Sequence, residues 1–186
     1  PYLLNADGTL QASCHPLLTA FREFWRLCFL DHLWPLASYR MERWRADLPR
    51  EVAVIKGACL LLRREALSQV GLLDERYFIY SEEMDLCHRL ALSGWRLYWV
   101  PEARVMHLGG GSTRQLAAEM YLQLYRSKAQ YQNKFWGERG ARRFARLLKL
   151  AYLPRWGAAS LAGLFSDTAR QRARLYGRLL AERLVV

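Results

Sequence analysis

Residues 57–89 read GACLLLRREALSQVGLLDERYFIYSEEMDLCHR, an apolar run that leads through a mixed segment into a cluster of acidic side chains. The overlapping stretch 53–63 is rich in Val, Ile and Leu, which predicts a buried strand. Residues 64–70 follow and stop at Gly71, which predicts a short helix ended by glycine. Residues 77–80 are aromatic and favour an extended segment. This alternation of strand and helix is typical of the α/β class.

A further helix is expected to begin at the acidic cluster. Ser81 is a typical N-cap residue, and Glu82 and Glu83 fall in the first turn, where the helix dipole favours anions. Gly94 is suited to ending the same helix. One apolar face is supplied by Leu86, Leu90 and Ala91.

The flanking sequence supplies more strands. The dipeptide at 7–8, Asp-Gly, lies between short apolar pieces and predicts a hairpin turn. Residues 95–100 and 103–108 predict two strands, the first stopped by Pro101. Because only one predicted strand is long and buried, we expect residues 1–112 to form a partial mixed sheet with an exposed apolar edge.

Helical patterns precede and follow these strands. Residues 19–34 predict an amphipathic helix or an aromatic loop. From Gln115 onward the pattern is helical, basic and aromatic, and Gly137 and Pro154 are expected to divide it into three helices.

Composition limits the class of protein. The chain has 186 residues, of which 52% are hydrophobic, enough for one globular domain with a core. Its four cysteines are widely spaced without a CxxC pair, which argues against a zinc site or a disulfide framework. No apolar run approaches the roughly 20 residues that a membrane span needs. The chain begins at Pro1 rather than Met, so we expect further sequence to precede it.

The net charge of +11 is unevenly distributed. Residues 1–112 hold 13 Lys/Arg and 13 Asp/Glu, whereas residues 113–186 hold 15 Lys/Arg and 4 Asp/Glu. A basic amphipathic helix favours an anionic membrane surface. Nucleic acid is the rival partner, but no nucleic-acid motif supports it. A helical extension with solvated charges is the structural alternative. The basic positions that share helical faces are Arg142, Arg143, Arg146 and Lys149.

The carboxylates Glu82, Glu83 and Asp85 open one predicted helix just after an aromatic segment. A carboxylate on a rigid helix start can act as a general base. The alternative is a solvated acidic helix start that stabilises the helix dipole. Asp85 also lies one turn from Arg89, so these two side chains could simply form an ion pair.

The motifs in 57–67, 70–78, 80–89, 94–96 and 100–107 occur in an order that resembles the second half of the GT-A fold in family 2 glycosyltransferases. The bacterial rhamnosyltransferase-like members are the most similar, and the resemblance spans roughly Asp7 to Thr113. It implies an α/β fold in which 1–113 is the acceptor-side, C-terminal half of a GT-A domain and 114–186 is a basic amphipathic helical extension.

The resemblance also implies roles for individual residues. The family motif usually reads Glu-Asp-x-Asp, and its second acid, the expected general base, corresponds to Glu83, which is one methylene longer. Glu82 and Asp85 complete the catalytic set. His107 is expected either to ligate Mg²⁺ or Mn²⁺ or to be structural. The loop 109–112 either cradles phosphate or is a plain turn. The expected acceptor- or substrate-binding residues are Gly57, Ala58, Trp95 and Ser112.

The implied function is inverting sugar transfer at the cytoplasmic face of the plasma membrane, with the protein bound peripherally. The donor would be a nucleoside-diphosphate sugar, for example dTDP-rhamnose, and the acceptor a cell-surface polysaccharide or lipid-linked glycan. The family holds its nucleotide and metal with an Asp-x-Asp motif, and this sequence has none. We therefore expect this segment alone to bind the donor weakly and to be inactive. The alternative is a non-enzymatic membrane- or partner-binding module derived from a glycosyltransferase that lacks its donor site.

Overall fold

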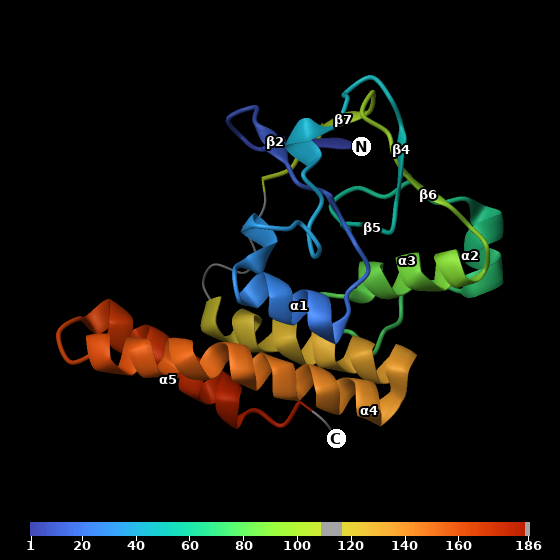
Figure 1. Ribbon diagram of the computed structural model, residues 1–186. Helices are drawn as coiled ribbons and strands as arrows, with labels where there is room; N and C mark the ends of the chain where they lie inside the picture. Colours follow the sequence, from blue (N-terminus) through green and yellow to red (C-terminus); the bar gives the residue numbers. More distant parts are fainter. Residues whose placement is uncertain (109–116, 185–186) are drawn as a thin grey trace. The chain divides into compact units, whose positions relative to one another are not determined.

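The computed structural model describes residues 1–108 and 117–184 (Figure 1). The chain forms two compact units. One comprises Pro1–Leu17 and Pro35–Gln115 and mixes strands with helices, and we call it the mixed unit. The other comprises Leu18–Trp34 and Leu116–Val186, and we call it the helical unit. Residues 18–34 therefore pack with the C-terminal helices, an association that the sequence analysis did not predict.

A three-stranded sheet in the mixed unit contains both pairing directions. Strand β1 (Tyr2–Leu4) pairs antiparallel with β2 (Leu10–Gln11) and parallel with β7 (Arg104–Met106). The predicted hairpin at Asp7-Gly8 is confirmed, because it joins β1 to β2. Gly8 has a φ of 80°, in the left-handed region that glycine adopts readily.

Two further strand pairs lie in the described part of the mixed unit. Strand β3 (Cys14–His15) pairs antiparallel with β5 (Val54–Ile55). Strand β4 (Arg50–Val52) pairs antiparallel with β6 (Leu97–Trp99), and a short 3-10 turn, η2 (Met41–Arg43), precedes β4.

Two helices position the acidic cluster. Helix α2 (Arg64–Val70) has the predicted bounds and ends at Gly71, whose φ is 82°. Helix α3 (Glu82–Leu92) begins at the acidic cluster as expected. Its buried face includes Met84, Leu86, Cys87 and Leu90.

Two predicted extended segments are wrong. Of 53–63, only Val54–Ile55 is a strand, because the partner strand is short and the residues before it, Leu10–Gln11, already pair with β1. Residues 77–80 contain no strand and form bends instead. Tyr80 adopts a φ of 67°, which is incompatible with extended backbone.

The helical unit is built from α1 (Ala20–Leu27), a 3-10 turn η1 (Leu30–His32), α4 (Ala117–Ala162) and α5 (Asp167–Ala181). Gly137 interrupts α4 with a φ of 63°, as predicted. The predicted break at Pro154 is wrong, because α4 continues through it to Ala162. The neighbouring Ala151 and Tyr152 are buried in the core, and that packing holds the helix together across the proline.

The core of the helical unit brings α1, both parts of α4 and α5 together. Three tyrosine hydroxyls meet inside it: Tyr152 is hydrogen-bonded to Tyr121, and also to Tyr125 at 2.8 Å. No helix in the described part of the chain combines the length and the apolar composition that crossing a membrane requires.

Candidate active site

The start of α3 is held in an unusual backbone conformation. Tyr80 and Ser81 both lie in the left-handed region, with φ of 67° and 69°. Ser81 occupies the predicted N-cap position, but its side chain makes no capping hydrogen bond. A left-handed conformation costs a non-glycine residue roughly 1–2 kcal/mol, so two in succession mark a segment whose shape is imposed by its surroundings. These two residues directly precede Glu82 and Glu83, so their conformation sets the direction in which α3 begins.

Glu83 faces Gly57, the first residue of the predicted substrate-binding pair Gly57-Ala58. A Cβ atom placed on Gly57 would lie 3.5 Å from Cβ of Glu83 and 3.8 Å from its Cγ. Because Gly57 has no side chain, nothing from this position covers the carboxylate of Glu83. Both Gly57 and Ala58 are exposed, so solvent reaches this side of the helix start.

The surroundings of Glu83 make its carboxylate more basic. Burial is the main cause that raises its pKa above the usual value of 4.5, and the negative charge of Glu82 raises it further. The cation of Lys56 acts in the opposite direction but does not reverse the shift. A carboxylate with raised proton affinity is suited to taking a proton from a hydroxyl group.

Two polar atoms near this helix start are buried without a hydrogen-bond partner among the described residues. They are Oε2 of Glu82 and the hydroxyl of Tyr77. Burial, followed by the charges of Asp85 and Asp74, raises the pKa of Tyr77 above its usual value, so the phenol stays protonated. Such atoms in a folded protein call for an explanation, and a bound water or substrate hydroxyl would supply the missing partner.

Asp85 forms a buried ion pair with Arg89. This confirms the pairing that their i,i+4 spacing suggested. Its side chain is fully buried, and its Oδ2 accepts a hydrogen bond from Nε of Arg89 at 2.7 Å. Arg89 also donates to the main-chain oxygens of Val70 and Leu72, at the end of α2. The pair therefore joins α3 to α2 and fixes the base of the helix that carries Glu83.

His107 lies at the end of β7, where Gln11 of β2 holds its ring. The Nδ1 atom of His107 is 2.7 Å from Oε1 of Gln11, and Nε2 of Gln11 donates to the main-chain oxygen of His107. An Nδ1–H donated to Gln11 leaves Nε2 as the atom with a lone pair. Within residues 1–108 and 117–184, no three His, Cys, Asp or Glu side chains gather in a way that could hold a metal ion. The loop 109–112, including Ser112, lies outside the described residues.

Trp95 lies beyond the other end of α3 from Glu83. It lines a shallow groove of about 410 Å³ and donates its indole N–H to Oε1 of Gln69 at 2.8 Å. Ala91 of α3 lines the same groove, and its separation of eight positions from Glu83 corresponds to about 12 Å of helix. The predicted substrate-binding residues therefore separate, with Gly57 beside Glu83 and Trp95 at the distant groove.

Sequence reasoning missed several features of this region. Tyr39 lines the groove with Trp95 although it precedes α3 by more than 40 residues, and no local pattern connects the two. The left-handed Tyr80 and Ser81 were also missed, because aromatic residues and serine do not favour positive φ. The one sequence signal for this segment was the aromatic run at 77–80, and it does not predict a positive φ.

Comparisons with known proteins agree with the resemblance. The model of Glycosyl transferase family group 2 matches residues 14–179. The chain is 38% identical over 117 residues to N-acetylglucosaminyl-diphospho-decaprenol L-rhamnosyltransferase of Mycobacterium tuberculosis, covering 61% of this chain and 38% of the relative. It is 34% identical over 65 residues to rhamnosyltransferase WbbL of Escherichia coli K12, covering 35% of this chain and 25% of the relative.

No solved structure matches the chain. The matched segments span well under two thirds of both relatives, and the longer one spans 38%. The family match, by contrast, covers most of the chain, including α3 and the three carboxylates at its start. The chain belongs to glycosyl transferase family group 2, with a mixed α/β unit and a helical C-terminal region.

Proposed function

We propose that the protein transfers L-rhamnose from a nucleoside-diphosphate donor, dTDP-rhamnose, to a lipid-linked glycan with inversion at the anomeric carbon. The observation that carries the proposal is Glu83, a partly buried carboxylate of raised pKa beside the exposed Gly57. The sugar rests on both relatives, whose names specify rhamnosyl transfer, and the acceptor class rests on the mycobacterial relative, whose name specifies a diphospho-decaprenol.

Glu83 is proposed as the general base. Its carboxylate accepts the proton of the acceptor hydroxyl as that oxygen bonds to the anomeric carbon of the donor. The bond from this carbon to the diphosphate oxygen breaks, and the nucleoside diphosphate leaves with the bonding electrons. As long as the pKa of the base stays below the working pH, a higher pKa makes the carboxylate a stronger proton acceptor. Burial and the charge of Glu82, which raise the pKa of Glu83, therefore favour this step.

Glu82 and Asp85 support this step in different ways. Oε2 of Glu82 has no hydrogen-bond partner within the described residues, and an acceptor hydroxyl would give it one. Asp85 acts as a positioning residue through Arg89, because it anchors the helix that carries Glu83. Gly57 and Ala58 are proposed to border the acceptor, since both are exposed and Gly57 lies next to Glu83. Trp95 and Ser112 stay predictions.

The Mg²⁺ or Mn²⁺ implied by the family resemblance stays a prediction for the full-length enzyme, because the described residues alone do not form a site for it. His107 is the predicted ligand, yet no set of three ligating side chains exists around it in the part of the chain that the structure describes. Three or more protein or substrate oxygen ligands are usual for these ions. The proposed mechanism therefore contains no step through a metal.

The helical unit is proposed to hold the protein at the cytoplasmic face of the plasma membrane, near a lipid-linked acceptor. The whole +11 excess of positive charge lies in residues 113–186. Each Lys or Arg close to an anionic surface contributes about 1 kcal/mol, so a few are sufficient for reversible binding.

The test is a transfer assay on the full-length protein with dTDP-rhamnose and a polyprenyl-diphosphate-linked N-acetylglucosamine acceptor. We expect a rhamnosylated lipid whose new linkage has the anomeric configuration opposite to that of the donor, read by NMR. dTDP-glucose and UDP-galactose serve as competing donors. Transfer from either in preference to dTDP-rhamnose would contradict the proposed sugar. Absence of transfer from all three, with acceptor binding intact, would favour the non-enzymatic module.

A further inference from the structure

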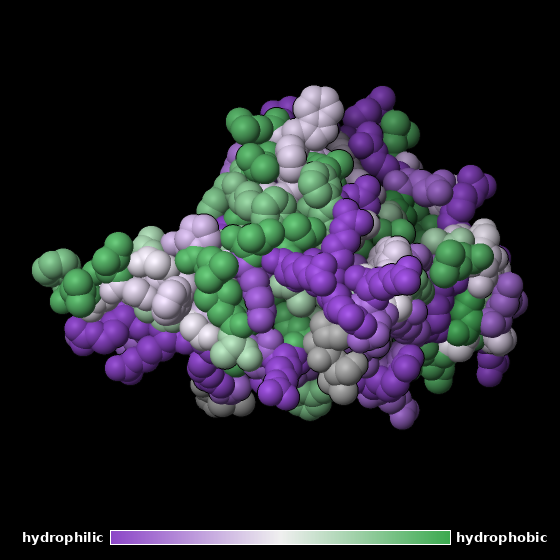
Figure 2. Space-filling view, turned by 60° about the horizontal axis from the view of Figure 1, so that its bottom comes forward, coloured by the Kyte–Doolittle hydropathy of each residue, from purple (hydrophilic) through white to green (hydrophobic). Residues whose placement is uncertain are grey.

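The turn between α4 and α5 exposes apolar side chains. Leu161 is 70% exposed, Leu164 is 69% exposed and Phe165 is 92% exposed. We call these three side chains, with the turn that carries them, the hairpin tip. In Figure 2, apolar surface gathers at the far end of this helical hairpin. Single exposed leucines are ordinary, but three large apolar side chains within five residues form a patch.

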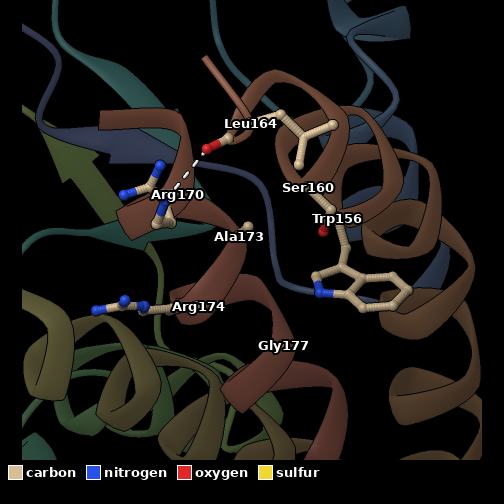
Figure 3. Close-up of a pocket in the computed structure, with 8 residues that line it drawn as sticks. Trp156, Ser160, Leu164, Arg170, Ala173, Arg174 and Gly177 are labelled. Carbon is tan, nitrogen blue, oxygen red and sulfur yellow. Dashed lines mark hydrogen bonds between the residues drawn. The ribbon is translucent and has the colours of Figure 1, made fainter. Parts of the chain in front are cut away.

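Hydrogen bonds hold the turn in one conformation. The main-chain N–H groups of Gly163, Leu164 and Phe165 donate to the last turn of α4, at 2.8, 3.2 and 3.1 Å. Arg170 of α5 donates to the main-chain oxygen of Gly163 at 3.2 Å, as Figure 3 shows, and pairs with Asp167. A Cβ on Gly163 would lie 3.1 Å from Cα of Arg170, so a larger residue here would require the neighbouring backbone to shift by a few tenths of an ångström. The apolar side chains therefore project from a turn that hydrogen bonds hold in a defined conformation.

Positive charge lies directly behind the tip. Residues 156–174 contain three arginines and one acidic residue, Asp167. Arg172 and Arg174 are exposed on the first turns of α5. A groove of about 370 Å³ runs between the two helices below the tip. In Figure 3, Trp156 and Leu164 lie on one side of this groove, and the guanidinium groups of Arg170 and Arg174 lie on the other.

We propose that the hairpin tip inserts into the interface of a bilayer that contains anionic lipids, and that Arg172 and Arg174 bind lipid phosphates. This inference rests on the proposed membrane association of the helical unit, and it assigns the site of membrane contact to the hairpin tip. Apolar side chains below the headgroups, with arginine and tryptophan at headgroup level, are the arrangement that interfacial proteins use.

A second copy of the chain is a poorer occupant of this patch. Joining two tips would bring their arginines together, and like charges repel. Three side chains are also too small a surface, because stable protein interfaces bury roughly 1,200 Å² or more in total. An anionic bilayer instead complements both the apolar tip and the charge behind it.

The test measures binding of the full-length protein to vesicles of phosphatidylcholine with and without phosphatidylglycerol. The triple variant Leu161→Ser/Leu164→Ser/Phe165→Ser is expected to bind the anionic vesicles about a hundredfold more weakly, because interfacial binding scales with inserted apolar area. The matched control, Leu61→Ser/Leu72→Ser/Phe78→Ser, removes the same residue types from exposed positions of the mixed unit and should bind as the parent does.

A charge variant separates the two contributions. Arg172→Gln/Arg174→Gln is expected to weaken binding to anionic vesicles about thirtyfold at low salt, and to leave binding to neutral vesicles unchanged. High salt should abolish this difference but not the effect of the triple variant, because salt screens charge and not apolar insertion.

The outcomes separate this inference from the proposals beneath it. If the parent binds vesicles and the triple variant binds equally well, the tip is excluded while membrane association stands. If the parent does not bind, membrane association itself fails, and rhamnosyl transfer to a soluble acceptor remains a separate measurement. If the triple variant instead lowers the sedimentation coefficient of the lipid-free protein, the tip is a contact between copies and the inference is overturned.

Discussion

Glu23 of the helical unit and Glu83 of the mixed unit are both acidic side chains at helix starts, yet their surroundings are opposite. Glu23 is 4% exposed and forms ion pairs with Arg26 at 2.7 Å and Lys128 at 2.8 Å. Burial alone would raise its pKa, but Lys128 and Arg26 outweigh burial and lower the pKa to about 2. Glu83 has Glu82 as its charged neighbour, and its pKa is raised.

This difference separates a structural carboxylate from a reactive one. A carboxylate enclosed by two cations is stable as an anion and has little tendency to take a proton. When burial and a neighbouring negative charge destabilise the ionised form of a carboxylate, that carboxylate accepts a proton more readily. Asp85 belongs with Glu23, since it is buried and paired with Arg89. The comparison therefore supports the proposal that Glu83 is the general base, whereas Glu23 and Asp85 are held in ion pairs.

The largest expected effect is on turnover. Glu83→Gln should lower kcat by about two to four orders of magnitude, because the amide cannot accept the proton of the acceptor hydroxyl. Donor binding should be retained, which isothermal titration with the sugar nucleotide would check. Near-normal turnover of this variant, with a collapse for Asp85→Asn, would move the base to Asp85 and reverse the comparison.

The raised pKa of Glu83 gives the pH dependence of this effect a direction. Because the base acts in its ionised form, kcat should fall as pH decreases through a pKa that lies above 4.5. The acid limb should be absent from the residual activity of Glu83→Gln. An acid limb that persists in that variant would assign the titration to another group.

The next effect is on stability and concerns Asp85. Asp85→Asn should lower the free energy of unfolding by about 3 kcal/mol, because it leaves Arg89 partly buried without its carboxylate. Glu83→Gln serves as the control and should not destabilise the protein, since it removes a charge that burial disfavours. Urea denaturation of both variants measures the contrast. Equal losses of stability would mean that Asp85 and Glu83 play the same structural part.

Much of the region around α3 could be predicted because its signals are local. Glycine at position 71 ended α2 where expected, and the acidic cluster marked the first turn of α3. The i,i+4 spacing of Asp85 and Arg89 was sufficient to suggest their ion pair. What the sequence could not show is that Arg89 also reaches the carbonyls of α2, because that contact depends on the tertiary fold.

The failures concern pairing and packing over long distances. The apolar run 57–63 has the composition of a strand, but it pairs with no strand among the residues that the structure describes, and composition alone cannot supply a partner. Pro154 looked like a helix end, yet α4 passes through it because Ala151 and Tyr152 are fixed in a core shared with α1 and α5. Glu23 and Lys128 are 105 positions apart, so their ion pair was invisible in the sequence.

Acid titration of the helical unit should show the consequence of that pair. The pKa of Glu23 is 4.5 in the unfolded chain and about 2 in the fold, so the stabilisation is complete above pH 4.5 and is lost as pH falls towards 2. The loss is on the order of 3 kcal/mol. Arg26 and Lys128 stay protonated throughout this range and do not alter it. Unfolding followed by circular dichroism should show this slope in the parent and lose it in Glu23→Gln.

The smallest effect tests the strained entry to α3. Ser81 has a φ of 69° and makes no capping hydrogen bond with its side chain, so Ser81→Gly removes strain without removing a cap. We expect the free energy of unfolding to rise by up to about 1 kcal/mol. The matched control is Ser93→Gly at the other end of the helix, where φ is −91° and glycine should destabilise by roughly 0.5–1 kcal/mol. If Ser81→Gly gains stability but loses turnover, the left-handed backbone serves to hold Glu82 and Glu83 in place. If Ser81→Gly and Ser93→Gly destabilise equally, the entry to α3 is not strained and Glu83 owes its setting to burial alone.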